Sequence, residues 1–425
     1  MESLQKQPKS MEELPEEVLA EIIIRLPAKR IGQLRCVCKP LNALSSNPSF
    51  IKSHLHRSIP NNDEMLLVFH NRFCFEGGKP ITAHPSRSPH IVNPNFIKLP
   101  VNFNIPSAYN CSSVIGSVNG LICFVVWSSI VPGPDPIIYI WNPSLSAVRT
   151  LPPFTIRGFD DLYFRFGFDP KTDDFKVVKL TRLLHKYIHY QPGVKKNCFD
   201  WLQVEVYSMR KGSWKRINDR FPSHVVRFSD EDVSITGNDG HDGRLHWLCN
   251  VVSRRAKQTI IAFDLATETF SEIYLPDSIA NNKKEPRKQV LGDLAGKLCV
   301  MSYIEDGDIK DGNVEVWVMN EYGVAESWVK HHILSRFSGN VVPIGITLSN
   351  EFILQGDDDS LALYDHIAAK VKSFKVIDIN RYSYGTVQIV PYVDSLVWIA
   401  PANRVDQQQL RQMFVANFGK LITDW

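Results

Sequence analysis

Charge of one sign does not dominate this sequence. Its 48 lysine and arginine residues nearly balance 45 aspartate and glutamate residues, which leaves a formal net charge of +3. Bulk charge therefore gives no indication of binding to nucleic acid or to an anionic membrane. No apolar run reaches membrane-spanning length either: the longest candidate, residues 121–130, has about ten residues and includes Trp127 and two serines. We expect neither a nucleic-acid partner nor a membrane partner.

Cysteine pairs and a secretory signal are also missing. None of the eight cysteines lies in a C-x-x-C pair, and residues 1–13 are polar and mixed in charge, without the apolar centre of a signal peptide. We therefore expect reduced, mostly buried thiols in a protein of the cytoplasm, the nucleus or both.

Motifs of common enzymes do not occur. The sequence has no G-x-S-x-G elbow, P-loop, H-E-x-x-H or G-x-G-x-x-G pattern. Asp357–Asp359 lacks the spacing of a calcium loop, and His331 and His332 are expected to point to opposite faces of a strand. We predict no catalytic residue, no cofactor and no metal site.

The strongest helical pattern lies near the N-terminus. Glu16 and Glu17 follow Pro15, as is favourable in the first turn of a helix, and Pro27 ends the pattern. Two further short patterns follow, so we predict three helices. Three helices in about forty residues cannot bury all of their apolar side chains, and the remaining face needs a partner in this chain or in another. The apolar positions of the first pattern recur at helical spacing: Val18, Leu19, Ile22, Ile23 and Leu26.

This stretch resembles an F-box. The resemblance is carried by Leu14-Pro15, Leu26-Pro27, Val37-Cys38-Lys39 and Asn47 to Ile51, with one departure, because Leu41 stands where an aromatic residue is usual. The resemblance implies docking on the Skp-type adaptor of a cullin-based ubiquitin ligase; a helical cap on the main domain is the alternative. The residues assigned to the adaptor-binding face are Leu14, Pro15, Val18, Ile22, Ile23, Leu26, Pro27, Leu34, Val37 and Cys38.

After residue 60 the sequence repeats a strand-like unit. A turn glycine is followed 21, 20 and 21 residues later by an aromatic residue in Gly120–Trp141, Gly243–Phe263 and Gly296–Trp317. The aromatics at 141, 207, 263, 317 and 364 recur at intervals near 50, each before another strand-like stretch. Such a period, with several short strands per unit, is typical of a β-propeller.

The ring must also close. Residues 387–399 resemble the start of another unit, and we expect residues 65–75 to supply its missing strands, because an open sheet edge invites aggregation. The prediction is an α+β multidomain chain: a three-helix F-box, then an all-β propeller of about six units. A pair of packed sheets is the alternative. The expected boundaries are 1–10 disordered, 11–57 F-box, 58–64 linker, 65–400 propeller and 401–425 C-terminal tail.

Residues 95–400 resemble the F-box-associated domain of plant F-box proteins. The resemblance is carried by the segments 117–123 (SVNGLIC), 141–144 (WNPS), 166–170 (FGFDP), Tyr207-Ser208 with Trp214, and 242–247 (DGRLHW). In that family the domain is held to recruit the protein that will be ubiquitylated.

Recognition is expected in the loops that interrupt the regular spacing. The aromatic and basic loop 183–201 is favoured, and its Tyr187, Tyr190 and Trp201 are assigned to substrate binding, although a solvated loop is the alternative. The predicted function is a non-catalytic substrate-recognition subunit of a Skp-cullin-F-box ligase. An F-box protein acting outside a ligase, a lectin-like propeller and a propeller hydrolase remain open, and the sequence does not name the substrate.

Overall fold

The computed structural model describes residues 15–58, 64–69, 81–86, 95–97, 109–128, 135–156, 162–183, 201–218, 221–228, 242–251, 257–280, 287–304, 314–334, 341–356, 360–374 and 388–399. The expectations for residues 1–10 and 401–425 lie outside these residues.

Four helices, rather than the three predicted, form the N-terminal helical module (residues 15–58). The chain does not turn away at Asn47-Pro48. Asn47 Oδ1 instead accepts a hydrogen bond from the backbone N–H of Ser49 at 2.9 Å, and Pro48 opens a further helix of 11 residues. Proline is well tolerated at a first helical position, so this turn signal is also a helix start. The helices are α1 (Glu16–Ile23), α2 (Ala28–Leu34), α3 (Lys39–Ser46) and α4 (Pro48–Ser58).

Six four-stranded antiparallel sheets follow, which confirms the propeller of about six units. We number these blades in chain order of their first strands. Blade 1 is β4 (Tyr109–Val118), β5 (Leu121–Ser128), β6 (Ile137–Asn142) and β7 (Ala147–Thr150); blade 2 is β8 (Leu162–Asp169), β9 (Asp174–Leu183), β10 (Trp201–Ser208) and β11 (Ser213–Arg216); blade 3 is β12 (Val225–Phe228), β13 (Arg244–Val251), β14 (Lys257–Asp264) and β15 (Thr269–Tyr274).

The remaining blades repeat this order. A short helix, α5 (Asp277–Ala280), lies between blades 3 and 4, and a 3₁₀ turn, η2 (Ala325–Ser327), lies within blade 4. Blade 4 is β16 (Lys288–Leu294), β17 (Lys297–Tyr303), β18 (Val314–Met319) and β19 (Trp328–Leu334); blade 5 is β20 (Val341–Ile346), β21 (Phe352–Gly356), β22 (Leu361–Asp365) and β23 (Lys370–Phe374); blade 6 is β24 (Gln388–Tyr392), β1 (Met65–Phe69), β2 (Ile81–Pro85) and β3 (Asn95–Ile97).

Blade 6 closes the ring with strands from both ends of the propeller. β24 pairs antiparallel with β1, with Met65 opposite Tyr392 and Phe69 opposite Gln388. This confirms that the first strand-like stretch joins the last unit. The pairing removes the open edge that each strand would otherwise present.

The glycine-to-aromatic repeat has a simple structural basis. Gly120, Gly243 and Gly296 lie in the turn between the first two strands of their blades, with φ of 75°, 84° and 76°. Side chains rarely allow this backbone conformation, and glycine adopts it without strain. Each aromatic partner lies on the third strand of the same blade. The 20 or 21 residues between glycine and aromatic therefore span the second strand, the connection after it and most of the third strand.

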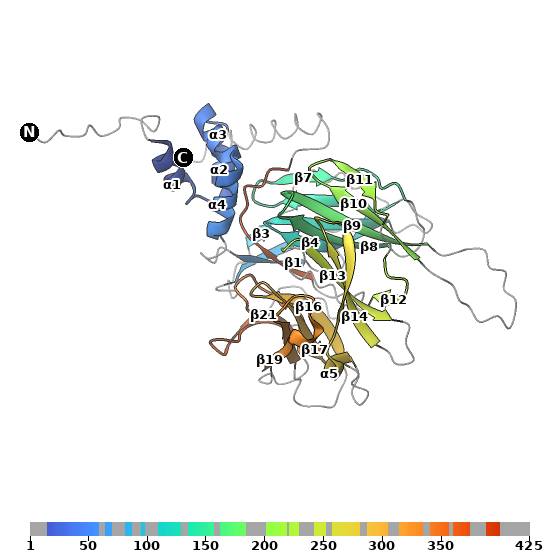
Figure 1. Ribbon diagram of the computed structural model, residues 1–425. Coiled ribbons are helices and arrows are strands. Elements are labelled where there is room, and N and C mark those ends of the chain that lie inside the picture. Colours follow the sequence, from blue (N-terminus) through green and yellow to red (C-terminus); the bar gives the residue numbers. More distant parts are fainter. Residues whose placement is uncertain are drawn as a thin grey trace, which may run out of the picture.

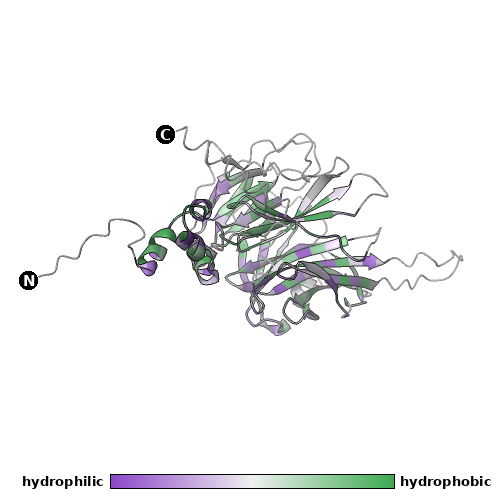
Figure 2. Cartoon of the chain, turned by 90° about the horizontal axis from the view of Figure 1, so that it is seen from above, coloured by the Kyte–Doolittle hydropathy of each residue, from purple (hydrophilic) through white to green (hydrophobic). Residues whose placement is uncertain are grey.

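The propeller has two faces, set by the alternation of its strands. Turns between first and second strands, and between third and fourth strands, emerge on one face, and the other connections emerge on the opposite face. The helical module lies on the first of these, called here the helix-side face (Figure 1). Lys52 of α4, for example, lies 3.3 Å from Asp173 in the β8–β9 turn. Figure 2 shows the same arrangement from above, with apolar residues running along the strands.

No helix among the described residues is both long enough and apolar enough to cross a membrane.

Candidate functional site

Two neighbouring apolar rows divide helix α1 between core and surface. Leu19 and Ile23 point inward and are 8% and 1% exposed, whereas Val18 and Ile22 point outward and are 44% and 47% exposed. Residues four apart lie on the same side of a helix, so each pair forms one row. The apolar stripe predicted from the sequence therefore consists of two rows. Leu19 and Ile23 pack in the core of the helical module, and Val18 and Ile22 remain exposed on its surface.

The ten residues assigned to adaptor binding fall into different environments. Leu14 lies outside the described residues. Ile23 lies in the core of the helical module, and Leu34 and Cys38 are half-buried. Six residues are exposed: Pro15, Val18, Ile22, Leu26, Pro27 and Val37, the last with an exposed fraction of 63%. We call these six the outer row.

The inner side of the module is covered by a residue of the propeller domain. Leu396 is fully buried in one cluster with Leu19, Ile23, Ala28 and Ile31 of the helices. It belongs to residues 393–399, which follow β24 and are called here the junction segment. Residues 387–399 were expected to start another unit, and β24 (Gln388–Tyr392) does supply a strand of blade 6. The expectation was wrong for residues 393–399. The segment has no strand and packs against the helices instead.

The junction segment also caps helix α2. Asp394 Oδ2 accepts a hydrogen bond from the backbone N–H of Ala28 at 2.5 Å, and its other oxygen accepts one from the hydroxyl of Ser144. Pro27, at the N-cap position, provides no capping side chain. A helix N-terminus leaves backbone N–H groups unpaired and favours negative charge, so the Asp394 carboxylate suits both requirements.

Blade 1 contacts the junction segment through hydrogen bonds and close backbone packing. The buried Asn142 side chain donates to the carbonyl oxygens of Ser395 and Val397 at 3.0 and 2.8 Å. Gly120 lies directly against the segment: a Cβ placed there would lie 2.3 Å from Ser395 Cβ. Gly120, Asn142 and Ser144 belong to the motifs that carry the resemblance to the F-box-associated domain, and they converge on this segment.

Further contacts join the helices to the propeller. A Cβ at Gly32 of α2 would lie 2.9 Å from Leu145 Cδ2 in the β6–β7 turn, so α2 packs closely against this turn. The Arg35 guanidinium lies 5.5 Å from the ring centre of Trp398, within the range of a cation–π contact. Together these contacts hold the helical module in one orientation on the propeller.

Of the residues assigned to substrate binding, only the backbone of Trp201 is described. β9 ends at Leu183 and β10 begins at Trp201, and these two strand ends lie on the face opposite the helices. Tyr187 and Tyr190 lie outside the described residues, and Trp201 is placed only by its backbone. Their role in binding stays a prediction.

The histidine pair of β19 differs from expectation. Val316 pairs with His332 and Trp317 with Lys330, so His331 is the extra residue of a β-bulge. A bulge disturbs the alternation of side chains. Both rings therefore approach His366, at centroid distances of 5.7 and 6.0 Å, rather than pointing to opposite faces. Within the described ranges, no group of three or more His, Cys, Asp or Glu residues is placed to hold a metal ion.

Asp169 and Asp264 each cap a turn through a backbone hydrogen bond. The Oδ1 atom of each accepts a backbone N–H two residues later, from Lys171 at 3.0 Å and from Ala266 at 2.9 Å. The cysteines are in part as expected: Cys123, Cys249 and Cys299 are buried, and Cys36 is exposed.

Comparison with known proteins identifies both parts of the chain. Residues 11–53 match the F-box domain, and residues 70–384 match the F-box associated beta propeller domain. The F-box protein CPR1 of Arabidopsis thaliana is 28% identical over 341 residues, covering 75% of this chain and 72% of that protein. The F-box/kelch-repeat protein At3g23880 of the same plant is 28% identical over 372 residues, covering 83% and 87%. The chain therefore belongs to the family of F-box proteins with an F-box-associated beta propeller domain.

Proposed function

We propose that this protein is a non-catalytic substrate-recognition subunit of a Skp-cullin-F-box ubiquitin ligase. The observation that carries the proposal is the outer row: apolar side chains exposed on an F-box whose inner side is already closed by the propeller. An apolar surface rimmed by polar residues is typical of a binding site for another protein. The proposed occupant is a Skp-type adaptor, with a cullin bound through it.

The outer row offers a substantial apolar contribution to binding. Val18, Ile22, Leu26 and Val37 are 44%, 47%, 36% and 63% exposed. Burying the exposed half of such a side chain contributes about 1 kcal/mol. Four of them supply a useful part of the free energy of a specific protein–protein contact, and polar groups around them supply specificity.

The propeller then holds the substrate protein on the face opposite the F-box. Catalysis here is positioning: a bound substrate meets the ubiquitin-carrying enzyme at a high local concentration. The junction segment supports this role, because a fixed F-box orientation keeps the substrate in one place relative to the ligase. We propose that Tyr187, Tyr190 and Trp201 contribute to substrate binding, and that the protein acts in the cytoplasm, the nucleus or both.

The test replaces two outer-row residues in the full-length chain. Val18→Asp with Ile22→Asp places two carboxylates in the proposed contact without touching the core of the module. The matched control is Val329→Asp with Ile333→Asp on β19, whose side chains are 51% and 46% exposed. Ile23 is unsuitable for this test, because a buried charge there would unfold the F-box.

Pull-down from plant extract, with the proteasome blocked, separates the possible functions. The wild type and the β19 variant are expected to capture adaptor and cullin, and the outer-row variant neither. Equal capture by the outer-row variant contradicts the proposed face. Capture of the adaptor without the cullin would indicate an F-box protein acting outside a ligase. Capture of neither by the wild type would direct attention to a lectin-like or hydrolase activity of the propeller.

A further inference from the structure

The region where the F-box meets blade 2 is rich in positive charge. Residues 28–58, which form α2 to α4, contain six lysine and arginine residues and no aspartate or glutamate. The Lys52 ammonium of α4 lies 3.3 Å from the Asp173 carboxylate in the β8–β9 turn. This turn, the β10–β11 turn and β7 supply further cations. We call the following five residues the basic corner: Lys52, Arg149, Lys171, Arg210 and Lys211.

Hydrogen bonds hold the parts of the basic corner together. Arg210 Nη1 donates to the Thr172 carbonyl oxygen at 2.9 Å, which links the two turns of blade 2. Arg149 Nη1 donates to the Met209 carbonyl oxygen at 3.2 Å, which joins blade 1 to the β10–β11 turn. The backbone N–H of Arg210 donates to Asp174 Oδ1 at 2.8 Å. A partner therefore meets a backbone that is already fixed, and little conformational entropy is lost on binding.

The nearby carboxylates do not balance the basic corner. The contacts described for the Arg149 guanidinium are a carbonyl oxygen and the ring of Tyr207, and no hydrogen bond or ion pair of the Lys211 ammonium is found among the described contacts. The buried pair of Asp169 and Lys176 is neutral. Three carboxylates interact with residues of the basic corner: Asp173, Asp174 and Asp264. Five cations thus face three carboxylates, and an excess of positive charge remains.

We propose that the basic corner binds an acidic segment of a partner protein, an extended chain with several aspartate or glutamate side chains. The inference goes beyond the proposed function and does not rest on it. Four of the five cations are exposed, and only Arg149 is half-buried. They come from a helix, a strand and two turns, so a chain with several carboxylates matches them better than a single small anion. Complementary charge speeds association and disfavours partners of the wrong sign.

Asp173 favours a polypeptide over DNA as the occupant. Its carboxylate lies within the basic corner, 3.3 Å from the Lys52 ammonium, and its side chain is 53% exposed. A polypeptide can donate a backbone N–H to this carboxylate. The DNA backbone carries a negative charge at each phosphate and has no donor to offer. The basic corner therefore attracts an acidic protein segment and repels a uniform polyanion at one point.

The experiment follows the fluorescence anisotropy of a labelled dodecapeptide of alternating glutamate and serine as full-length protein is added. Arg210→Glu with Lys211→Glu reverses two charges of the basic corner. The matched control is Lys297→Glu with Lys370→Glu, two exposed lysines at the helix-side ends of β17 and β23, because it changes the net charge equally. A peptide of alternating glutamine and serine is the uncharged probe. A short duplex DNA with the same number of negative charges as the acidic peptide is the competing polyanion.

The wild type and the control variant are expected to bind the acidic peptide equally at about 50 mM salt, and more weakly at about 500 mM, because salt screens exposed charges. The basic-corner variant is expected to bind about tenfold more weakly. Lys211→Glu alone removes no described side-chain contact, so it tests the surface without endangering the fold, and should lose about threefold. The uncharged peptide is expected not to bind.

Failure of the wild type to bind the acidic peptide overturns the proposal, and so does equal binding by the wild type and the basic-corner variant. An equal loss in the control variant would show that net charge alone matters, which contradicts a defined surface. Tighter binding of the duplex DNA than of the peptide would contradict the assignment to a protein segment.

Discussion

The Asp394 carboxylate lies 2.5 Å from the backbone nitrogen of Ala28, a residue 366 positions earlier in the chain. A side chain that follows the last propeller strand thus caps the second helix of the F-box. The junction segment is consequently part of both the propeller and the F-box core, and the packing of the F-box helices depends on residues that follow the last propeller strand.

Removing the cap is expected to weaken the junction. Asp394→Ala leaves the N–H of Ala28 without its acceptor and should lower the free energy of unfolding of the helical module by about 1 kcal/mol. Asp394→Asn is the matched control, because it keeps an acceptor oxygen and should lose less. Denaturant unfolding followed by a probe on the F-box measures both values. Equal stability of the alanine variant and the wild type would contradict the capping role.

Truncating Leu396 is expected to loosen the helices selectively. Leu396→Ala opens a cavity in the core that the segment shares with α1 and α2, at a cost of about 2–5 kcal/mol. Leu363→Ala is the control, since Leu363 is equally buried but lies in the core between blades 5 and 6. Hydrogen exchange should accelerate in α1–α3 only for Leu396→Ala. Similar exchange in both variants would show that the helices fold independently of the junction.

The buried ion pair between Lys179 Nζ and Glu205 Oε2, 2.9 Å apart, is expected to matter for stability as a pair. Burial lowers the pKa of Lys179, and its contact with Glu205 opposes this effect. Lys179→Met leaves a buried carboxylate unpaired and should cost about 3–5 kcal/mol. The double variant Lys179→Met with Glu205→Gln keeps an acceptor oxygen for the backbone N–H groups of Thr155 and Ile156 and should be clearly more stable than the single one. A double variant as unstable as Lys179→Met would argue against charge as the cause.

Acid is expected to weaken the β8–β9 turn. Burial alone would raise the pKa of Asp169, but hydrogen bonds from Thr172 and the cation of Lys176 hold it below its usual value. A lowered carboxylate pKa stabilises the fold above the unfolded-state value, about 3.9, and this contribution is lost as the pH falls through the folded-state value.

Comparison of Asp169→Asn with the wild type tests whether the Asp169 carboxylate stabilises the fold at neutral pH and loses this effect in acid. The variant removes one partner of a buried ion pair, with a 2.9 Å contact to Lys176 Nζ, and should be about 3 kcal/mol less stable at neutral pH. The difference should shrink when unfolding is measured near pH 3. Asp264→Asn is the control, because Asp264 also caps a turn but has no ion pair among the described contacts. It is expected to lower the free energy of unfolding by about 1 kcal/mol. A difference for Asp169→Asn that does not change with pH would contradict the argument.

The architecture was predictable because its signals are local and periodic. Glycines that need positive φ mark the same turn in three blades, and the aromatic that follows lies on the same strand of each. The first F-box helix was predictable from Pro15, Pro27 and the apolar positions between them. The closure by β1 followed from a general argument, that a propeller with an incomplete last unit needs a strand from elsewhere.

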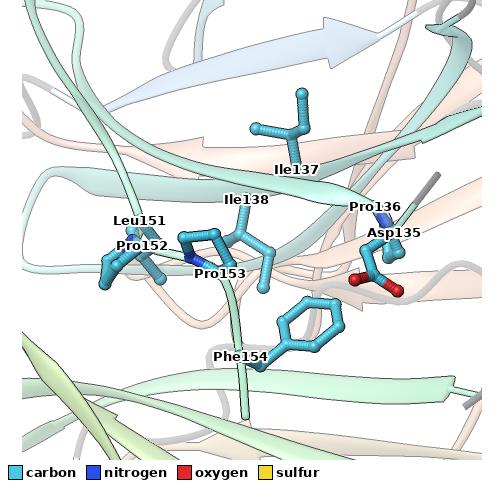
Figure 3. A pocket seen from close by; sticks show the side chains of 8 residues that line it. All are labelled: Asp135, Pro136, Ile137, Ile138, Leu151, Pro152, Pro153 and Phe154. Atoms are coloured by element: carbon cyan, nitrogen blue, oxygen red, sulfur yellow. The ribbon is translucent and has the colours of Figure 1, made fainter. Parts of the chain in front are cut away.

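The junction was not predictable from the pattern, because residues 394–398 have the composition of a strand. Tertiary contacts with Asn142, Ser144 and the F-box core determine their conformation instead. The sequence also does not show which apolar residues of α1 are buried and which are exposed, because this is decided by Leu396 and the other helices that pack against Leu19 and Ile23. A cavity on blade 1 is lined by residues 135–138, at the start of β6, and by residues 151–154, after β7, and only the packed sheet shows that these two stretches meet (Figure 3).

Calorimetric titration of purified full-length protein with a purified Skp-type adaptor, followed by addition of the cullin, tests the central claim most directly. The predicted result is a one-to-one complex with a Kd of about 1 μM or lower, to which the cullin adds. Absence of adaptor binding at about 100 μM would contradict the ligase function. An adaptor complex that excludes the cullin would contradict it as well.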